Sequence, residues 1–424
     1  MMRVRSILGL FIVVFVMSIM PTFAQRAEEE QLLKATDELV EATARLRGLQ
    51  PKEPIRKGIK NREEITQYMT RKIDEEYSPE RLLMEGKMLK KLGLLPENID
   101  YRQLVVNLLT EQVQGLYDPE EKVLFIASWL SMAEQDSVMV HEITHALQDQ
   151  HFDLRAIFRA NRASDNDDRA LAHQALFEGD GTVLALQYVI DPLKRHFSDL
   201  PDLAFVQEMQ MDAMQDQSPV LASIPQFLKE TLVFPYGYGA TFLQKAWKHN
   251  SSWDAINKMY SDLPASTEQI IHPEKYFETR DNPKVVNATP LASKLGSDWK
   301  IPYKSVLGEF MLGQLLDLHL NKEHAKRAVT GWGGDELLLL ENSSGKNAVW
   351  IETEWDTLDD AEKFFTAMSE WFRLHYPKAV RNDVKQDGFS LVQNSEFSSL
   401  KRSGTIVRIL IGLTEADGRK LENP

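Results

Sequence analysis

The stretch that decides the fold runs Val-His-Glu-Ile-Thr-His-Ala-Leu from Val140 to Leu147. In a helix of about 3.6 residues per turn, residues four apart project from nearly the same side, so His141 and His145 can bind one metal ion. Glu142 lies one position round from His141, beside that ion rather than on it. A carboxylate in this place can take a proton from a zinc-activated water and pass it to a leaving group. The stretch therefore predicts a hydrolytic zinc site.

The residues around this stretch predict a helix with one buried face. Ser131 and Glu134 have the spacing of a capping box, and Met132 is then the first helical residue. Apolar residues follow at helical intervals, namely Val138, Ile143, Ala146 and Leu147. We therefore expect the histidine motif to lie on a core helix.

A catalytic zinc ion needs a third protein ligand, and two residues compete for that place. Glu178 lies in a second predicted helix, from about Asp168 to Ile190, where apolar residues also recur at helical spacing. His151 follows His141 by ten residues, the interval of metzincins, but Gln148 stands where that class has a helix-breaking glycine. If the helix continues through Gln148, His151 points away from the ion. We favour Glu178 and keep His151 as the alternative.

The segment from His141 to Asp149, His-Glu-Ile-Thr-His-Ala-Leu-Gln-Asp, resembles the active helix of thermolysin-like gluzincins. The resemblance offers Asp149 as a carboxylate partner for a metal-bound histidine, and an exposed Asp149 near the helix end is the alternative. Two features depart from thermolysin. The interval to Glu178 is longer, and Thr182 stands where an aspartate would follow that glutamate by four residues. We therefore do not expect the exact fold of thermolysin.

A longer part of the chain, from about Arg81 to Trp355, resembles a group of exported, largely uncharacterised predicted zinc metallopeptidases. The resemblance rests on separated phrases: Gln-Gly-Leu-Tyr-Asp-Pro (Gln114–Pro119), the active-helix phrase extended to Leu154, Glu-Gly-Asp-Gly (Glu178–Gly181), Ser-Thr-Glu-Gln-Ile-Ile-His-Pro-Glu-Lys-Tyr (Ser266–Tyr276) and Gly-Trp-Gly-Gly-Asp (Gly331–Asp335). It implies peptidase activity with Zn²⁺ as the cofactor, but it brings no known substrate.

A predicted β-hairpin precedes the active helix. Its turn, Tyr-Asp-Pro-Glu-Glu (Tyr117–Glu121), lies between two apolar stretches of the segment Gly115–Ala127. In zincin-like folds, a strand in the place of Lys122–Ala127 lies at the sheet edge above the metal. A peptide substrate could pair with such an edge, and an ordinary core hairpin is the alternative.

Hydrolysis also needs a donor for the oxyanion that forms during attack. His272 is the first candidate, because a short capped helix, Thr267–Ile271, would place it at the helix C-terminus, where the dipole favours the charged imidazolium. Tyr236 and Tyr238 are alternative donors, in a glycine-rich turn, Phe234–Gly239, that we expect to open the next helix. A packing role is an equally good interpretation for each of the three.

The N-terminus has the pattern of a signal peptide. Arg3 and Arg5 precede the apolar run Ile7–Met20, and a small-residue cleavage pattern ends at Ala24. We expect an exported protein, periplasmic or extracellular, with an uncleaved anchor as the alternative. The absence of cysteine excludes disulfides and a lipid-modified cysteine. The net charge of -14 argues against nucleic acid and anionic lipid as partners, so we expect no membrane contact beyond the signal segment.

The positions of proline-rich and polar stretches predict the domain organisation. After the signal peptide at 1–24, residues 25–92 are a charged helical region that serves as a scaffold or a prosegment. Residues 93–292 form the catalytic domain, which ends within a stretch rich in proline and asparagine. Residues 293–424 mix helices and strands. Four tryptophans are expected in the core of this last part: Trp332, Trp350, Trp355 and Trp371.

The sequence thus predicts an α+β protein with a mostly helical zincin-like catalytic domain, a small edge-strand sheet and a C-terminal α+β module. We expect an exported, gluzincin-type zinc peptidase acting on a peptide or protein. In it His141, His145 and Glu178 hold the metal, and Glu142 activates water. Two alternatives stay open. One is a zinc hydrolase with a non-peptide substrate, and the other is a non-catalytic surface or assembly protein, against which an intact Glu142 speaks. Endopeptidase and exopeptidase action, and the oligomeric state, are left open.

Overall fold

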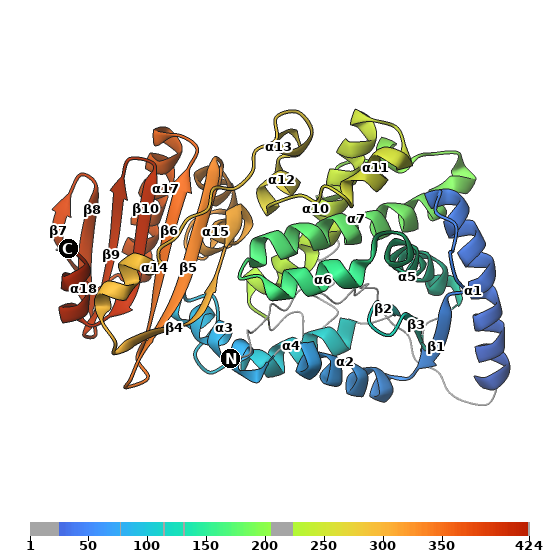
Figure 1. Cartoon of the computed structure of the whole chain (residues 1–424), viewed down its shortest axis with the longest axis horizontal. Coiled ribbons are helices and arrows are strands. Elements are labelled where there is room, and N and C mark those ends of the chain that lie inside the picture. Colours follow the sequence, from blue (N-terminus) through green and yellow to red (C-terminus); the bar gives the residue numbers. More distant parts are fainter. Residues whose placement is uncertain (1–24, 77, 113–114, 130–131, 205–223, 423–424) are drawn as a thin grey trace.

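The structure is a computed structural model that describes residues 25–76, 78–112, 115–129, 132–204 and 224–422. The predicted signal peptide, Met1–Ala24, and the predicted cap Ser131 lie outside the described residues. Figure 1 shows an elongated molecule with a large sheet at one end and a mostly helical part around a small sheet at the other. Helices and sheets together give the α+β class expected from the sequence.

The mostly helical part contains the two helices that the sequence predicts for the site. Its elements are α1 (Gln25–Arg47), α2 (Arg62–Glu76), α3 (Pro79–Lys91), α4 (Tyr101–Gln112), α5 (Met132–Phe152), α6 (Leu154–Ala163), α7 (Asp167–Ile190), η1 (Asp191–Leu193), η2 (Phe197–Asp199), α10 (Gln226–His249), α11 (Trp253–Met259), α12 (Thr267–Ile271) and α13 (Glu274–Phe277). Two short helices that follow, α14 (Thr289–Ala292) and η3 (Ser293–Leu295), lie on the large sheet instead. Helix α5 begins at the predicted residue. Helix α7 begins one residue earlier than expected, because Asn166 caps it by accepting the N–H of Arg169.

The small sheet has the order β1 (Arg56–Lys60), β3 (Val123–Ala127), β2 (Gly115–Asp118). The predicted hairpin is confirmed, because β2 and β3 pair antiparallel. The predicted edge position of Lys122–Ala127 is wrong, because β1 pairs in parallel with the far side of β3. Strand β2 is left at the edge beside α5. The sequence does not predict β1, since Arg-Lys-Gly-Ile-Lys has too few apolar residues to alternate.

The N-terminal region packs against helix α5 and the small sheet. Helix α1 lies along α5, and β1 completes the small sheet, as Figure 1 shows at its right-hand end. The region predicted as helical, residues 25–92, therefore contains a strand as well, and it supports the helix that carries the histidine motif.

Helices α7 and α10 cross in direct backbone contact. A Cβ atom on Gly239 would lie 2.0 Å from the carbonyl oxygen of Ala175, and one on Gly179 would lie 2.3 Å from the carbonyl carbon of Gly239. The segment Phe234–Gly239, predicted as a turn before a helix, lies inside α10 instead, with Pro235 in the helix interior. The prediction is wrong because Gly239 allows close packing rather than a turn, and the helix tolerates the one N–H that Pro235 lacks.

The large sheet is antiparallel in the order β4-β5-β6-β10-β9-β8-β7. Its strands are β4 (Trp299–Ser305), β5 (Trp332–Asn342), β6 (Asn347–Trp355), β7 (Val380–Lys385), β8 (Gly388–Gln393), β9 (Glu396–Ser403) and β10 (Ile406–Leu413), and the associated helices are α15 (Gly308–Asp317), α16 (Lys322–Val329), α17 (Leu358–His375) and α18 (Glu415–Glu422). The sequence predicts strands at Leu337–Leu340, Ala348–Glu354, Phe389–Val392 and Thr405–Leu413, which correspond to β5, β6, β8 and β10. It does not predict β4, β7 and β9, because β4 and β7 are edge strands and β9 is rich in serine.

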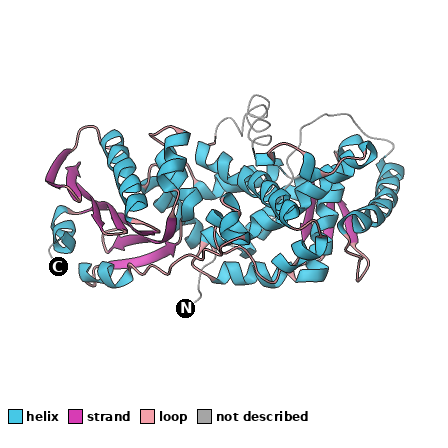
Figure 2. Cartoon of the chain, turned by 90° about the horizontal axis from the view of Figure 1, so that it is seen from above, coloured by secondary structure: helices cyan, strands magenta, loops and turns pink. Residues whose placement is uncertain are grey.

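Both faces of the large sheet are covered. Residues of α3, α4, α15, α16 and α17 share a core with one face, so the module and the helical part are packed together. Residues of α14, η3 and α18 cover the other face, and Figure 2 shows helices on both sides of these strands. The four tryptophans expected in the core of the module are at most 4% exposed, which confirms the expectation.

Within the described residues, none of the helices has the length and apolar character that crossing a membrane requires.

The contact between α7 and α10 gives a test of the fold. Replacing Gly239 by alanine should destabilise the protein by about 1–3 kcal/mol, because the new methyl group overlaps the Ala175 carbonyl and forces the helices apart. The matched control is Gly313→Ala in α15, where the nearest atom to a new Cβ lies 3.6 Å away. That variant should be neutral or up to about 1 kcal/mol more stable, because alanine favours a helix. Urea unfolding measures both, and equal stabilities would contradict the described crossing.

Candidate metal centre

Helices α5 and α7 bring three predicted ligands together inside the protein. Nε2 of His141 lies 3.0 Å from Oε2 of Glu178, and Nε2 of His145 lies 3.4 Å from the same oxygen. One ligand atom from each residue fits within 4.8 Å of the others. All three side chains are at most 3% exposed. Three donors from two helices therefore converge on one buried point.

The competing ligand, His151, lies elsewhere. Helix α5 continues through Gln148 to Phe152, so the helix break that a metzincin arrangement needs is absent. Nε2 of His151 makes a hydrogen bond of 2.8 Å with the carbonyl oxygen of Gln50. The structure thus places Glu178, and not His151, next to the two histidines.

Gln148 fixes the orientation of the second histidine. Its Nε2 donates to the carbonyl oxygen of Phe177 and to Oδ2 of Asp180, both at 3.1 Å, so its Oε1 is the acceptor. That oxygen lies 2.9 Å from Nδ1 of His145, which must therefore carry the proton. The lone pair of His145 is left on Nε2, the atom that faces Glu178.

Asp180 joins this arrangement to the N-terminal helix. Arg47 of α1 forms a two-pronged ion pair with Asp180, with Nε to Oδ1 at 2.8 Å and a second nitrogen to Oδ2 at 2.9 Å. Neither side chain is exposed. The hydroxyl of Tyr260 donates to the same carboxylate at 2.6 Å. Asp180 is therefore a fully bonded anion that holds Gln148 in place.

The histidine partner suggested by the gluzincin resemblance, Asp149, makes other contacts. Its carboxylate accepts the hydroxyl of Tyr117 at 2.9 Å and the N–H of Arg155. The second histidine is held by Gln148 instead, because that residue is three positions after His145 and lies on its side of α5. The role suggested for Asp149 is therefore wrong. The side-chain amide of Gln148 is the hydrogen-bond partner of His145.

The donor set fits a divalent metal of the zinc type. Burial lowers the pKa of His141, and it lowers the pKa of His145 to about 3, so both imidazoles are neutral and offer lone pairs. Burial also raises the pKa of the Glu178 carboxyl, and a bound cation would reverse that effect. Two neutral imidazoles and one carboxylate are a usual protein set for catalytic zinc.

Glu142 lies beside the three ligands and has one oxygen available. Oε2 accepts the N–H of Tyr117 on strand β2 at 2.8 Å. Oε1 is buried and has no hydrogen-bond partner within the described part of the chain. Burial first, and the negative charge of Glu178 second, raise the pKa of Glu142 well above its ordinary value. Such a carboxylate has a strong tendency to take up a proton.

The three candidate oxyanion donors are placed differently, and the ring of Tyr238 stacks on that of Phe234 within α10. The ring of Tyr236, on α10, lies 6.0 Å from the ring of His141, and its side chain hydrogen-bonds Glu178. His272 forms an ion pair with Glu309 of α15, with Nε2 2.9 Å from Oε1. His272 lies among side chains of α10, α12, α15 and α16. The structure thus brings Tyr236 to the centre, while His272 links the helical part to the C-terminal module.

A second acidic group does not form a metal centre. Oxygens of Glu268, Asp281 and Asp356 converge in the same way as the ligands above. The ammonium of Lys275 lies among them, 2.6 Å from Glu268 and 2.8 Å from each of the other two. A lysine therefore takes the place that a cation would need.

Comparison with known proteins adds little to this geometry. A family model described as a domain of unknown function, DUF8575, matches residues 300–422, which form most of the C-terminal module. None of the curated proteins matches the chain. A solved structure from Chloroflexus aurantiacus, described as "a putative hydrolase with a novel fold", is 19% identical, with a TM-score of 0.38 over 62% of this chain and 93% of that one. A likeness at this TM-score carries no argument.

The hydrogen bond of Gln148 gives a test of the centre. Gln148→Leu should weaken zinc binding by about 10–100-fold, because nothing then holds His145 with its lone pair toward Glu178. Gln150→Leu is the matched control, since Gln150 is on the same helix but bonds the backbone of Lys52 and Glu53, away from the centre. Competition with a chromogenic chelator measures both affinities. Equal affinities in the two variants would contradict the assigned role.

Proposed function

We propose that the protein is a zinc-dependent hydrolase that cleaves peptide bonds. The observation that carries the proposal is the buried convergence of His141, His145 and Glu178 beside a glutamate with an available oxygen. A structural zinc site needs no general base, whereas hydrolysis does. Zinc bound by these ligands would supply a Lewis acid that polarises a carbonyl group and lowers the pKa of water to about 7.

Glu142 is the group that moves the proton. The N–H of Tyr117 holds its Oε2, so Oε1 has a fixed position. Oε1 takes a proton from the attacking water and returns it to the nitrogen of the leaving amine. The raised pKa of Glu142 makes the carboxylate a good acceptor, and proton return to the amine restores it for the next cycle.

Tyr236 is the donor placed to stabilise the oxyanion. Its ring lies beside His141, and its hydroxyl already reaches a ligand carboxylate, Glu178. A hydroxyl at this position can turn to donate to a negative oxygen that forms over the centre. His272 is bound to Glu309 in another part of the molecule, so we assign the role to Tyr236.

The edge of the small sheet does not support the strand-pairing mode that the sequence suggests. The strand beside α5 is β2, and the N–H of Tyr117 on that strand is taken by Glu142. We therefore do not propose that the substrate pairs with this strand. The predicted export of the protein is part of the same proposal, and N-terminal sequencing of protein from the cell envelope tests it.

The variant Glu142→Gln tests the proposed chemistry. It should lower peptide hydrolysis by at least about 100-fold while zinc content stays unchanged, because glutamine keeps the shape but cannot take a proton. Asp153→Asn, which changes a carboxyl just after the same helix, is the control and should retain activity, because asparagine also caps helix α6. Digestion of a peptide library, with zinc measured in each sample, gives both readouts. Cleavage by Glu142→Gln at the unmutated rate would contradict the mechanism. Cleavage of esters or sugars but no peptides by the unmutated protein would favour a non-peptide hydrolase.

A further inference from the structure

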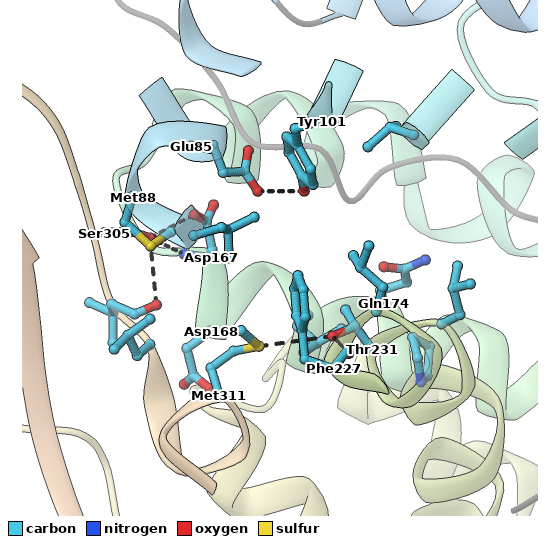
Figure 3. A pocket seen from close by; sticks show the side chains of 18 of the residues that line it. Glu85, Met88, Tyr101, Asp167, Asp168, Gln174, Phe227, Thr231, Ser305 and Met311 are labelled. Atoms are coloured by element: carbon cyan, nitrogen blue, oxygen red, sulfur yellow. Dashed lines mark hydrogen bonds between the residues drawn. The ribbon is translucent and has the colours of Figure 1, made fainter. Parts of the chain in front are cut away.

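Helices α10 and α15 each line two cavities. The larger cavity, of about 170 Å³, reaches the metal centre, because Gln174 and Tyr236 line it and hydrogen-bond Glu178. Figure 3 shows its wall, where the hydroxyl of Thr231 on α10 lies 3.9 Å from the sulfur of Met311 on α15. The smaller cavity, of about 150 Å³, is lined by other residues of these two helices, by α12 and by α16. None of the residues of the proposed metal centre lines this smaller cavity, and the mechanism proposed above does not use it.

Most of the wall of the smaller cavity is apolar, and its apolar side chains come from all four helices. They are Tyr238, Ile271, Phe310, Ala325 and Val329. Gly313 of α15 also lines the cavity, and a Cβ atom added there would lie 3.6 Å from Cγ2 of Val329. The glycine therefore leaves room beside the apolar wall. An apolar cavity of about 150 Å³ in another protein binds benzene, so this cavity suits an apolar body of about that size.

One carboxylate in this wall has an oxygen without a partner. Glu309 of α15 is 3% exposed, and its Oε1 lies 2.9 Å from Nε2 of His272. Its Oε2 is buried and has no hydrogen-bond partner within the described residues. The last torsion of a glutamate has a broad energy well, so a small turn of the carboxylate brings Oε2 to the cavity. A buried oxygen without a donor costs free energy, so a ligand that donates to Oε2 is favoured.

The charges around Glu309 favour a cationic donor. The imidazole of His272 lies between two carboxylates, with Nε2 2.9 Å from Glu309 and Nδ1 3.7 Å from Glu274. A second base that acts on Glu309 is Lys275, which is already bonded to Glu268, Asp281 and Asp356. Carboxylates therefore outnumber bases in this group. Burial raises the pKa of Glu309, and a cation beside Oε2 would oppose that effect.

The other end of the cavity carries both signs of charge. Asp317 follows Glu309 by two turns of α15, which is about 12 Å along the helix. Lys322 of α16 pairs with Glu230 of α10 at 3.0 Å, and Lys326 adds a second positive charge there. The excess of negative charge thus lies at the Glu309 end, and an ammonium group is attracted to that end.

We propose that this smaller cavity binds a small primary amine with an apolar body, whose ammonium group donates to Oε2 of Glu309 while the body lies beside Gly313. The ligand contacts α10 and α12 of the helical part and α15 and α16 of the C-terminal module. It is a free molecule, because the cavity has room for a compact apolar body rather than for a polypeptide. The proposal does not depend on the proposed hydrolytic function, since the two sites share no residue.

Calorimetric titration of the full-length protein with benzylamine tests the class of ligand. Benzylamine should bind with a Kd of about 1 mM or below, and benzyl alcohol, which has the same shape but no charge, at least about tenfold more weakly. Nα-acetyl-lysinamide, which stands for a lysine of a partner protein, should also bind more weakly than benzylamine. Equal binding of benzylamine and benzyl alcohol, tighter binding of the lysine compound, or no binding of benzylamine would each overturn the proposal.

The variant Glu309→Gln tests where the ammonium group binds. Glutamine keeps the shape of the side chain but removes its charge, so the Kd for benzylamine should rise at least about tenfold. Glu274→Gln is the matched control, because Glu274 also lies beside His272 but is exposed and does not line the cavity. That variant should change the Kd by less than about twofold, since solvent and salt screen an exposed charge. Equal Kd values in the two variants would overturn the role of Glu309.

The variant Gly313→Leu tests the cavity itself. The leucine side chain takes the space that the glycine leaves, so benzylamine binding should be lost while zinc content stays unchanged. Ala325→Leu, on α16 at the same cavity, repeats the test if Gly313→Leu does not fold. Benzylamine binding at the unmutated Kd in the folded variant would overturn the location, and it would leave the metal centre and its proposed function untouched.

Discussion

The buried ion pair between Arg47 and Asp180 is the interaction on which the rest of the centre depends. It fastens α1 to α7 with neither side chain exposed, and loss of one partner of such a pair costs about 3–5 kcal/mol because the other charge stays buried. Asp180 in turn holds Gln148, and Gln148 holds His145. An arginine at the end of the first helix thus sets the orientation of His145, a proposed metal ligand on α5.

Close helix packing is the second constraint. Glu178 reaches the histidines from α7, and Tyr236 reaches Glu178 from α10, because glycines let α7 and α10 touch. The cost is a helix with two glycines and an internal proline, residues that disfavour helical structure. The packing of the two helices outweighs these local preferences.

Local patterns were enough to predict that His141, His145 and Glu178 come together, because the histidine spacing and the apolar period of each helix are properties of the sequence alone. The same is true of the hairpin, of most helices and of the α+β class. The roles of metal ligand and general base stay predictions. The sequence could not predict contacts between distant residues: the partner of Arg47 is 133 positions away, and β1 forms only by pairing with β3. The hydrogen bond between Gln148 and His145 could have been predicted, since the two residues are three positions apart on one helix. The resemblance to gluzincins instead suggested Asp149 as the partner. Asp180 belongs to the Glu-Gly-Asp-Gly phrase (Glu178–Gly181), but its neighbours in the sequence do not indicate its bonds to Arg47 and Gln148.

Zinc content is the most direct test of the central claim, that α5 and α7 together form a metal centre. Elemental analysis of the purified protein should find close to one zinc ion per chain, little zinc in Glu178→Gln, and an unchanged amount in His151→Gln. Glutamine is a poor ligand in place of the carboxylate, whereas His151 bonds the backbone at Gln50 and lies apart from the centre. Loss of zinc in His151→Gln alone, or no zinc in the unmutated protein under metal-replete conditions, would contradict the account.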